Sequence, residues 1–366
     1  MLIAQREESP KYQQIREVIS KRISSGEWPE GYQLPPERVL AETYDISRVT
    51  VRSALSELVY QGVLERQHGR GTYVASQVPQ TMNDLILLVC VPPHGDVESD
   101  PFFSEILGVM SRTAAETRCS FAITPLSPTE SFARYLERHP NQLSHAAGVA
   151  FLNYSPADSE ILMLRKQEVP HVLIGYSESR EHVPFVMGDH EDAMFQAASH
   201  LLKHGCRRLA VIDGPWSSRV SQERLNGYMR ALREADVPFD ASLLVETSAW
   251  DKEAGKAAIE KLFAQTDDAD AILSAGDWSS FGAIHALQAR GIQVPAQMPI
   301  IIFGIFPWLQ AVLPFEPTYS KEDLQLLAKQ AMAMLEEQKA GFSLPGRYQR
   351  IKLDLVIGTS CGCQRK

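Results

Sequence analysis

Apolar residues in the first part of the chain recur at helical spacing in three stretches, residues 10–26, 36–44 and 47–61. Recurrence at every third or fourth position predicts three amphipathic helices. Two short runs rich in β-branched and aromatic residues follow at 63–66 and 72–74, on either side of a glycine-bearing turn, which is typical of a hairpin. Three helices and a hairpin in this order predict a winged helix-turn-helix.

From Asp84 onward the pattern changes to nearly continuous apolar runs separated by amphipathic stretches. Such runs are typical of strands that are covered on both faces. The expected strands are 85–91, 148–152, 171–174, 209–212, 271–273 and 300–303. Alternation of strands with helices predicts parallel α/β sheets. Because roughly 280 residues exceed the usual size of one such sheet, we expect two α/β lobes with a cleft between them.

The polar, proline-containing residues 76–83 predict a linker between these parts. The expected fold class is therefore an α+β winged helix-turn-helix domain followed by an α/β domain of two lobes. We expect the first domain to span residues 1–75, and a larger domain for effector binding and dimerisation to span 84–366.

Charge is distributed unevenly between the two parts. The net charge is −9, but residues 1–75 hold ten basic and ten acidic side chains and are neutral. Within 47–74, the four arginines Arg48, Arg52, Arg66 and Arg70 meet only two glutamates. A local basic surface matters more for DNA binding than the total charge, so we expect DNA at the small domain and not at the acidic remainder.

The rest of the composition indicates an ordinary globular protein of the cytoplasm. Apolar residues make up 44% of the chain, and no stretch approaches the roughly 18 apolar residues that a membrane span needs. The five cysteines are few and mostly far apart, with Cys361 and Cys363 separated by one residue. A structural zinc site needs four suitable ligands, so we interpret the cysteines as reduced thiols and expect neither metal nor cofactor.

The third helix has the properties of a recognition helix. Such a helix presents its N-terminal turns to the major groove, where Ser47, Arg48, Thr50 and Arg52 fall. Arg48 can form a bidentate contact to guanine, the commonest specific pairing. Glycines in the hairpin turn leave room for close approach to the minor groove. The residues expected at DNA are Lys11, Arg38, Ser47, Arg48, Thr50, Arg52, His68, Gly69 and Arg70.

The run from Leu34 to Val74 resembles the DNA-binding domain of the GntR family, whose pattern is roughly LPSERxLAxxxxVSRxTVRxALxxLxxxGxLxxxxGRGTxV. Nearly every fixed position is matched, although Pro36 stands where the family usually has serine. The resemblance implies DNA contacts from the seven residues Arg38, Ser47, Arg48, Thr50, Arg52, His68 and Gly69. The resemblance and the clustered arginines therefore both imply DNA binding.

The remainder resembles the effector-binding domain of the LacI/GalR family, itself similar to periplasmic sugar-binding proteins. The similar stretches are Asp100–Phe103, His200–Ile212, Glu223–Tyr228 and Ser360–Cys363. A GntR-type reader joined to a LacI-type sensor is known among arabinose-responsive repressors. The resemblance implies a two-lobed periplasmic-binding-protein-like fold with parallel sheets.

The same resemblance implies ligand contacts from Phe102, Phe103, Arg224, Trp250 and Asp277. Arg224 is expected to follow the first strand of the second lobe and to fork onto sugar hydroxyls or a carboxylate. Trp250 is expected to stack on the ligand, although a tryptophan in the core is the alternative.

Two departures from the family weaken the implication of a sugar ligand. Gly276 replaces an asparagine that contacts ligand in the family. For Asp277, the alternative to a ligand contact is that it only holds its loop. Residues 303–306 lack the aspartate that binds sugar hydroxyls, so a hydroxyl-rich ligand would lose hydrogen-bond partners there. His200 and His204 lie four apart on a helix, but the family pattern explains both, and no third metal ligand is placed near them.

The sequence therefore predicts a homodimeric transcription regulator, in the usual mode a repressor, that binds double-stranded operator DNA and a small-molecule effector. One alternative is a GntR-type regulator whose C-terminal domain binds a non-sugar ligand or only dimerises. Two others are a pyridoxal-phosphate enzyme domain and a transport binding protein. The first would be longer than this segment, and the second needs export. We find no arrangement of catalytic residues and expect no enzyme activity.

Overall fold

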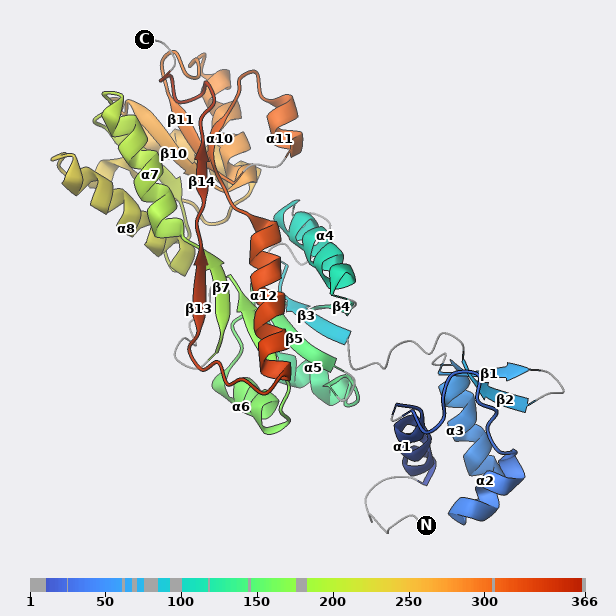
Figure 1. The fold of residues 1–366 in the computed structure, drawn as a ribbon. Helices are drawn as coiled ribbons and strands as arrows, with labels where there is room; N and C mark the ends of the chain where they lie inside the picture. The colour runs from blue at the N-terminus through green and yellow to red at the C-terminus, as the bar shows by residue number, and fades with distance from the viewer. Residues whose placement is uncertain are drawn as a thin grey trace. The chain divides into compact units, whose positions relative to one another are not determined.

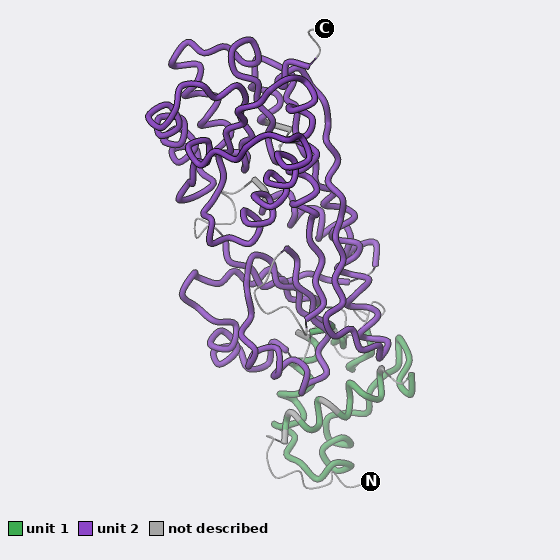
Figure 2. The backbone as a smooth tube through the Cα atoms, turned by 90° about the vertical axis from the view of Figure 1, so that its left-hand side faces the viewer, with its two compact units in different colours: residues 1–85, 145–147 green, residues 86–144, 148–366 purple. Residues whose placement is uncertain are grey.

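The computed structural model describes residues 11–24, 26–60, 63–67, 71–75, 85–92, 101–117, 119–143, 146–175, 183–304 and 307–363. The chain divides into two compact units (Figure 2). Residues 1–85 and 145–147 form the N-terminal unit, and residues 86–144 and 148–366 form the large unit. Among the described residues, none of the helices combines the length and the apolar content that crossing a membrane requires.

The N-terminal unit contains three helices followed by a two-stranded antiparallel hairpin (Figure 1). Its elements are α1 (Lys11–Ser24), α2 (Glu37–Tyr44), α3 (Arg48–Tyr60), β1 (Leu64–Gln67) and β2 (Gly71–Val74). In the hairpin Leu64 pairs with Val74. The winged helix-turn-helix predicted from the apolar pattern is confirmed, with element ends shifted by a residue or two. Residues 76–83, the predicted linker, lie outside the described residues.

One hydrophobic core holds the N-terminal unit together. Ile15 and Ile19 of α1 and Leu55 of α3 are at most 1% exposed, and they belong to one cluster with Leu40 of α2 and Leu64 of β1. The inward stripe of α3 thus leaves the residues on its other side available at the surface.

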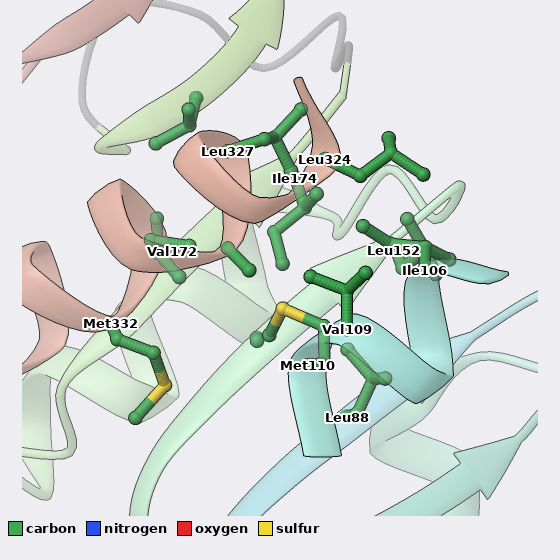
Figure 3. Close-up of a cluster of buried hydrophobic side chains, with 14 of the residues drawn as sticks. Leu88, Ile106, Val109, Met110, Leu152, Val172, Ile174, Leu324, Leu327 and Met332 are labelled. Carbon is green, nitrogen blue, oxygen red and sulfur yellow. The ribbon is translucent and has the colours of Figure 1, made fainter. Parts of the chain in front are cut away.

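The first lobe of the large unit is built on a sheet with the strand order β13-β7-β6-β5-β3-β4. Its strands are β3 (Leu85–Cys90), β4 (Ser120–Pro125), β5 (Ala146–Leu152), β6 (His171–Ile174), β7 (Phe185–Gly188) and β13 (Tyr348–Ile351). Its helices are α4 (Pro101–Glu116), α5 (Phe132–Arg138), α6 (Asp158–Lys166) and α12 (Leu324–Lys339). Leu88, Met110 and Leu327 from β3, α4 and α12 meet in its core (Figure 3).

The second lobe has a sheet with the strand order β14-β12-β11-β10-β8-β9. Its strands are β8 (Leu209–Asp213), β9 (Leu244–Glu246), β10 (Ala271–Ala275), β11 (Ile300–Phe303), β12 (Thr318–Lys321) and β14 (Asp354–Val356). Its helices are α7 (His190–Lys203), α8 (Arg219–Glu234), α9 (Lys252–Gln265), α10 (Asp277–Ala289) and α11 (Pro307–Val312). The described pairings are parallel except that of β12 with β14.

Within the described segments, the chain crosses between the two lobes three times. β7 ends at Gly188 in the first sheet and α7 begins at His190 in the second lobe, β12 is followed by α12 of the first lobe, and β13 is followed by β14 (Figure 1). Side-chain caps start two of the helices that follow such a crossing. Asp189 accepts a hydrogen bond from the Asp192 amide, and Asp323 accepts one from the Leu326 amide. The expected two-lobed α/β fold with mainly parallel sheets is confirmed.

Candidate functional site

The start of α3 exposes polar side chains around a capped N-terminus. The Ser47 Oγ accepts a hydrogen bond from the Thr50 amide at 3.1 Å, and the Ser47 and Thr50 hydroxyl oxygens lie 2.7 Å apart. Ser47 is thus the helix cap that its sequence position predicts. Arg48 is exposed directly after it. The hydroxyls and the guanidinium therefore lie at the positive end of the helix, where phosphate oxygens are stabilised.

Val49 is a residue that the sequence analysis did not select. It is 73% exposed, although valine is usually buried, and it lies between Arg48 and Thr50. An exposed apolar side chain on a recognition helix can contact the methyl group of thymine. Its place outside the inward stripe of α3, which includes Val51 and Leu55, was the available signal.

Glu37 at the start of α2 connects two of the arginines. The Arg52 Nη2 donates a hydrogen bond to the Glu37 Oε2 at 2.8 Å, and the Arg66 Nη2 donates one to the Oε1 at 3.3 Å. The hydrogen bond from Arg52 lowers the pKa of the Glu37 carboxyl, and the charge of Arg66 acts in the same direction. A single carboxylate thus fixes Arg52 of α3 and Arg66 of the wing strand β1 on one surface.

The other residues predicted at DNA are described only in part. Arg38 on α2 is exposed and pairs with Glu42 at 3.1 Å. Lys11 begins α1, but its side chain lies outside the described residues, as do the wing residues His68, Gly69 and Arg70. Their contacts stay predictions.

A second group of candidate side chains lies at the carboxyl ends of the second lobe's parallel strands, where ligands of open α/β sheets usually bind. Asp213, the last residue of β8, is fully buried. Its Oδ1 accepts hydrogen bonds from the Arg224 Nη1 at 3.3 Å and the Trp250 Nε1 at 3.2 Å. It also accepts one from the Ser221 Oγ at 3.2 Å. Asp213 thus brings together two of the predicted ligand residues, and sequence reasoning missed it.

Arg224 is held firmly where α8 passes this edge of the sheet. Its side chain is 11% exposed, and its guanidinium carbon lies 5.6 Å from the centroid of the Phe303 ring at the end of β11. A cation over an aromatic ring and beside a buried carboxylate has a restricted orientation. The guanidinium is therefore pre-positioned to donate hydrogen bonds.

The Trp250 side chain occupies the space beside Gly276. Gly276 has a φ of +84°, and a β-carbon there would lie 2.8 Å from the Trp250 Cδ1. A side chain at 276 would therefore collide with the indole, and only glycine adopts this backbone conformation without strain. Gly276 stands where the family has an asparagine that contacts ligand. The glycine removes that contact and makes room for the Trp250 indole.

Asp277 lies beside the segment that lacks the expected aspartate. A β-carbon at Gly304 would lie 3.2 Å from the Asp277 Oδ2, so this carboxylate covers the start of the 303–306 stretch. Ile305 and Phe306 lie outside the described residues. A carboxylate is thus present at this edge of the sheet, although it comes from α10 and not from the strand β11.

Phe103, one of the two aromatic residues predicted at the ligand from the first lobe, packs in the core of that lobe. Phe103 is 1% exposed and belongs to the core cluster of the first lobe, with Ile106 and Met110. The side chain of Phe102 lies outside the described residues. A ligand contact by Phe103 stays a prediction, and its burial indicates a packing role.

Charged residues connect the two lobes close to Arg224. Arg350 of β13 donates hydrogen bonds to Glu223 of α8, at 2.8 Å for the shorter contact, and Glu223 is 2% exposed. Burial lowers the pKa of His190 well below its usual value, and the charges of Arg224 and Arg350 act in the same direction. Burial also raises the pKa of Glu322 to about 7, against the opposing effect of Arg224. The pKa values of His190 and Glu322 at the lobe junction therefore depend on burial and on the arginines nearby.

Comparisons with known proteins identify a family for each of the two parts of the chain. Residues 11–74 match the family of bacterial regulatory proteins called the gntR family, and residues 86–305 match the family of periplasmic binding proteins and the sugar binding domain of the LacI family. The predicted combination of these two parts is confirmed.

Two curated relatives indicate how far the likeness extends. The arabinose metabolism transcriptional repressor of Geobacillus stearothermophilus is 25% identical over 346 residues, which covers 90% of this chain and 92% of that repressor. Catabolite control protein A of Priestia megaterium is 32% identical over 157 residues, which covers 43% of this chain and 47% of that protein. The first relative is thus similar over both parts of the chain.

Solved structures share the fold. The complex of the transcriptional regulator CelR with cellobiose has a TM-score of 0.66 at 22% identity and covers 96% of this chain and all 100% of that one. A regulatory protein of LacI family from Chloroflexus aggregans has a TM-score of 0.66 at 23% identity, covering 76% of this chain and 98% of that one. At these identities the likeness concerns the fold alone.

Proposed function

Because this chain belongs to the family of periplasmic binding proteins and LacI-type sugar-binding domains, and carries a gntR-type segment before it, we propose that it is a transcription regulator controlled by a small molecule. The observation that carries the proposal is the presence of both modules in one chain. In this proposal residues 1–75 bind operator DNA, 76–83 link the parts, and 84–366 bind the effector and dimerise.

Operator binding uses the exposed start of α3 together with the wing. Arg48 contacts a base edge, Val49 contacts an adjacent thymine methyl, and Ser47 and Thr50 bind phosphate or base edges. Lys11, Arg38, Arg52, His68, Gly69 and Arg70 supply backbone or minor-groove contacts. The exposure of the α3 residues and the capped helix start support this assignment.

The effector site uses Arg224, Trp250 and Asp277. A guanidinium and a carboxylate bind hydroxyl or carboxylate groups, while an indole face stacks on an apolar ring face. The common anchor of Arg224 and Trp250 on Asp213 supports this role. Asp277 supplies the acceptor that residues 303–306 lack, so a small sugar or a related metabolite fits the chemistry.

Control of DNA binding follows from two arrangements of the lobes. The effector binds one arrangement more tightly, and its difference in affinity shifts the population. In a homodimer this changes the spacing of two N-terminal units on a near-palindromic operator. Such a regulator acts in the cytoplasm as a repressor that the effector releases, and the proposal includes no catalytic step.

The test of DNA binding is selection of genomic fragments by the purified full-length protein at two salt concentrations. We expect a set of related, near-palindromic sites and an affinity that falls as salt rises. Enrichment without a shared sequence would contradict the proposal. A variant with Arg48→Ala serves as the control, because it should keep the fold and enrich the specific sites less strongly.

The test of sensing is a thermal-shift screen with sugars, sugar acids and nucleosides. A ligand at 100 times its dissociation constant should stabilise the protein by about 2.7 kcal/mol. The same ligand should change operator affinity, and Arg224→Ala should remove both effects. If only non-sugar compounds bind, the effector class is wrong, while the regulator itself stands.

A further inference from the structure

The end of α7 and the C-terminal segment bring together four side chains with metal-binding atoms. His200 lies in the last turn of α7, and His204 caps that helix, with 4.6 Å between their ring centroids. Cys361 and Cys363 approach them from the segment after β14. One ligand atom each of His200, His204 and Cys363 lie within 4.8 Å of one another.

Cys361 lies beside this group of three. Its Sγ lies 3.4 Å from the His200 Nε2 and 2.9 Å from the Cys363 Sγ. In a tetrahedral zinc site, bonds of about 2.3 Å to sulfur and about 2.0 Å to nitrogen place the ligand atoms about 3.3–3.8 Å apart. The two sulfurs, which lie 2.9 Å apart, therefore have to separate, and the Cys361 Sγ has to turn toward His204, before all four atoms surround one ion.

The C-terminal segment is fixed in position independently of the four ligands. The Ser360 Oγ donates a hydrogen bond to the Ile300 carbonyl at 2.7 Å and accepts one from the Thr318 amide at 2.8 Å. Ser360 is fully buried, and Cys361 is 3% exposed in the core cluster of the second lobe. The protein thus holds the cysteines against α7 before any ion binds, which reduces the ordering cost of binding.

We propose that His200, His204, Cys361 and Cys363 form a binding site for a thiophilic divalent cation of the zinc class. Two imidazoles and two thiolates make the Cys2His2 set that zinc takes in closed structural sites. Each cysteine loses its proton to solvent as its sulfur binds. The ion ties the C-terminal segment to α7 and stabilises the second lobe.

The site is separate from the effector residues, and the proposal does not depend on the regulatory function. α7 nevertheless runs from this site to the lobe junction, where Asp189 at its start lies 3.6 Å from Arg350. Occupation of the site therefore stiffens a helix that reaches the junction.

The direct test is titration of the full-length protein with Co²⁺ under reducing conditions after removal of metals by a chelator. We expect one ion per chain, with the visible absorption of tetrahedral cobalt and a sulfur-to-cobalt charge-transfer band. Zn²⁺ should displace Co²⁺, and competition with a coloured chelator should give the affinity. Cys363→Ser and His204→Gln should each weaken binding by at least about 100-fold. Cys119→Ser is the matched control, because this thiol lies in the first lobe.

A second measurement needs no variant. Zn²⁺ should slow alkylation of Cys361 and Cys363 in the unaltered protein and leave Cys119 at its original rate. Absence of stoichiometric binding, or equal binding by the variants and the control, would overturn the proposal. So would a Cys361–Cys363 disulfide that forms at the same rate with and without Zn²⁺, since the pair would then act as a redox couple.

Discussion

The arginines assigned to DNA and the arginine assigned to the effector are held in opposite ways. In the N-terminal unit Arg38 and Arg52 have side chains that are 69% and 58% exposed, and their partners Glu42 and Glu37 are 62% and 21% exposed. In the large unit Arg224 is 11% exposed, and the carboxylate of Asp213 beside it is fully buried. An exposed guanidinium can exchange its partner for a phosphate at little cost, whereas a buried one depends on the partner that it has.

Exposed arginines suit binding to DNA, which is a charged polymer, whereas a buried and oriented arginine suits contact with a small ligand. DNA binding is dominated by phosphate contacts and varies with salt, so its arginines have to stay in water. A guanidinium that meets a small molecule at the edge of a sheet has to be oriented beforehand, because each freely rotating side chain costs affinity. Substitutions in the two units should therefore have effects of different size and kind.

The largest effect is expected from Asp213→Ala. The change removes the acceptor of Arg224 and Trp250 and leaves a buried cation without its carboxylate, which costs about 3–5 kcal/mol. Thermal unfolding of the large unit should show the loss as a fall of roughly 10 °C. Effector binding should be lost as well. Glu260→Gln, which removes an exposed partner of Arg290, is the control and should leave the midpoint nearly unchanged. Equal effects of the two would contradict the comparison.

Glu322→Gln should have a smaller effect that depends on pH. Because burial raises the pKa of this carboxyl to about 7, the folded state binds its proton more tightly than the unfolded state does. The resulting stabilisation is complete below pH 4.5 and is lost as pH rises through 7. Glutamine imitates the protonated form.

The variant should therefore match the original protein below pH 4.5 and exceed it at pH 8, by up to about 3 kcal/mol. Thermal unfolding at several pH values measures this difference. A constant difference at all pH values would show that the lobe junction does not titrate through Glu322.

Arg48→Ala should weaken operator binding by about 1–3 kcal/mol and relax specificity at one base pair, with no change in thermal stability. Gel-shift measurements on the operator and on single-base variants report both quantities. Arg38→Ala is the matched comparison, because a phosphate contact should weaken all sequences equally and reduce the salt slope by about 1. Unchanged binding by Arg48→Ala would refute its assignment.

The smallest effect is expected from Glu37→Gln. The change frees Arg52 and Arg66 from their shared carboxylate, so non-specific DNA binding should tighten and its salt slope should increase by up to about 1. Stability should change by no more than about 1 kcal/mol above pH 4.5. Weaker operator binding would instead mean that Glu37 positions the two arginines for the operator.

Local patterns were sufficient for the N-terminal elements, for six strands of the large unit and for the fold class, but they missed β4, β7, β9, β12, β13 and β14. The apolar stripes placed α1, α2 and α3 to within a residue or two, because a helix that buries one face carries apolar residues at every third or fourth position. The continuous apolar runs placed the central strands β6 and β11 for a similar reason. Arg224 could be selected because it lies within a short motif.

Tertiary structure alone decided which distant residues meet. Nothing in the sequence around Asp213 indicates its role. Its partners Arg224 and Trp250 lie 11 and 37 positions later, and only the fold brings them to its carboxylate. Phe103 matched a motif, yet the packing of α4 placed its ring in the core. Cys361 lies 161 positions from His200, and a metal site among such residues exists only when the sheet brings the C-terminal segment back against α7. Sequence spacing fixes what neighbours along an element share, while contacts between elements depend on how their buried faces pack.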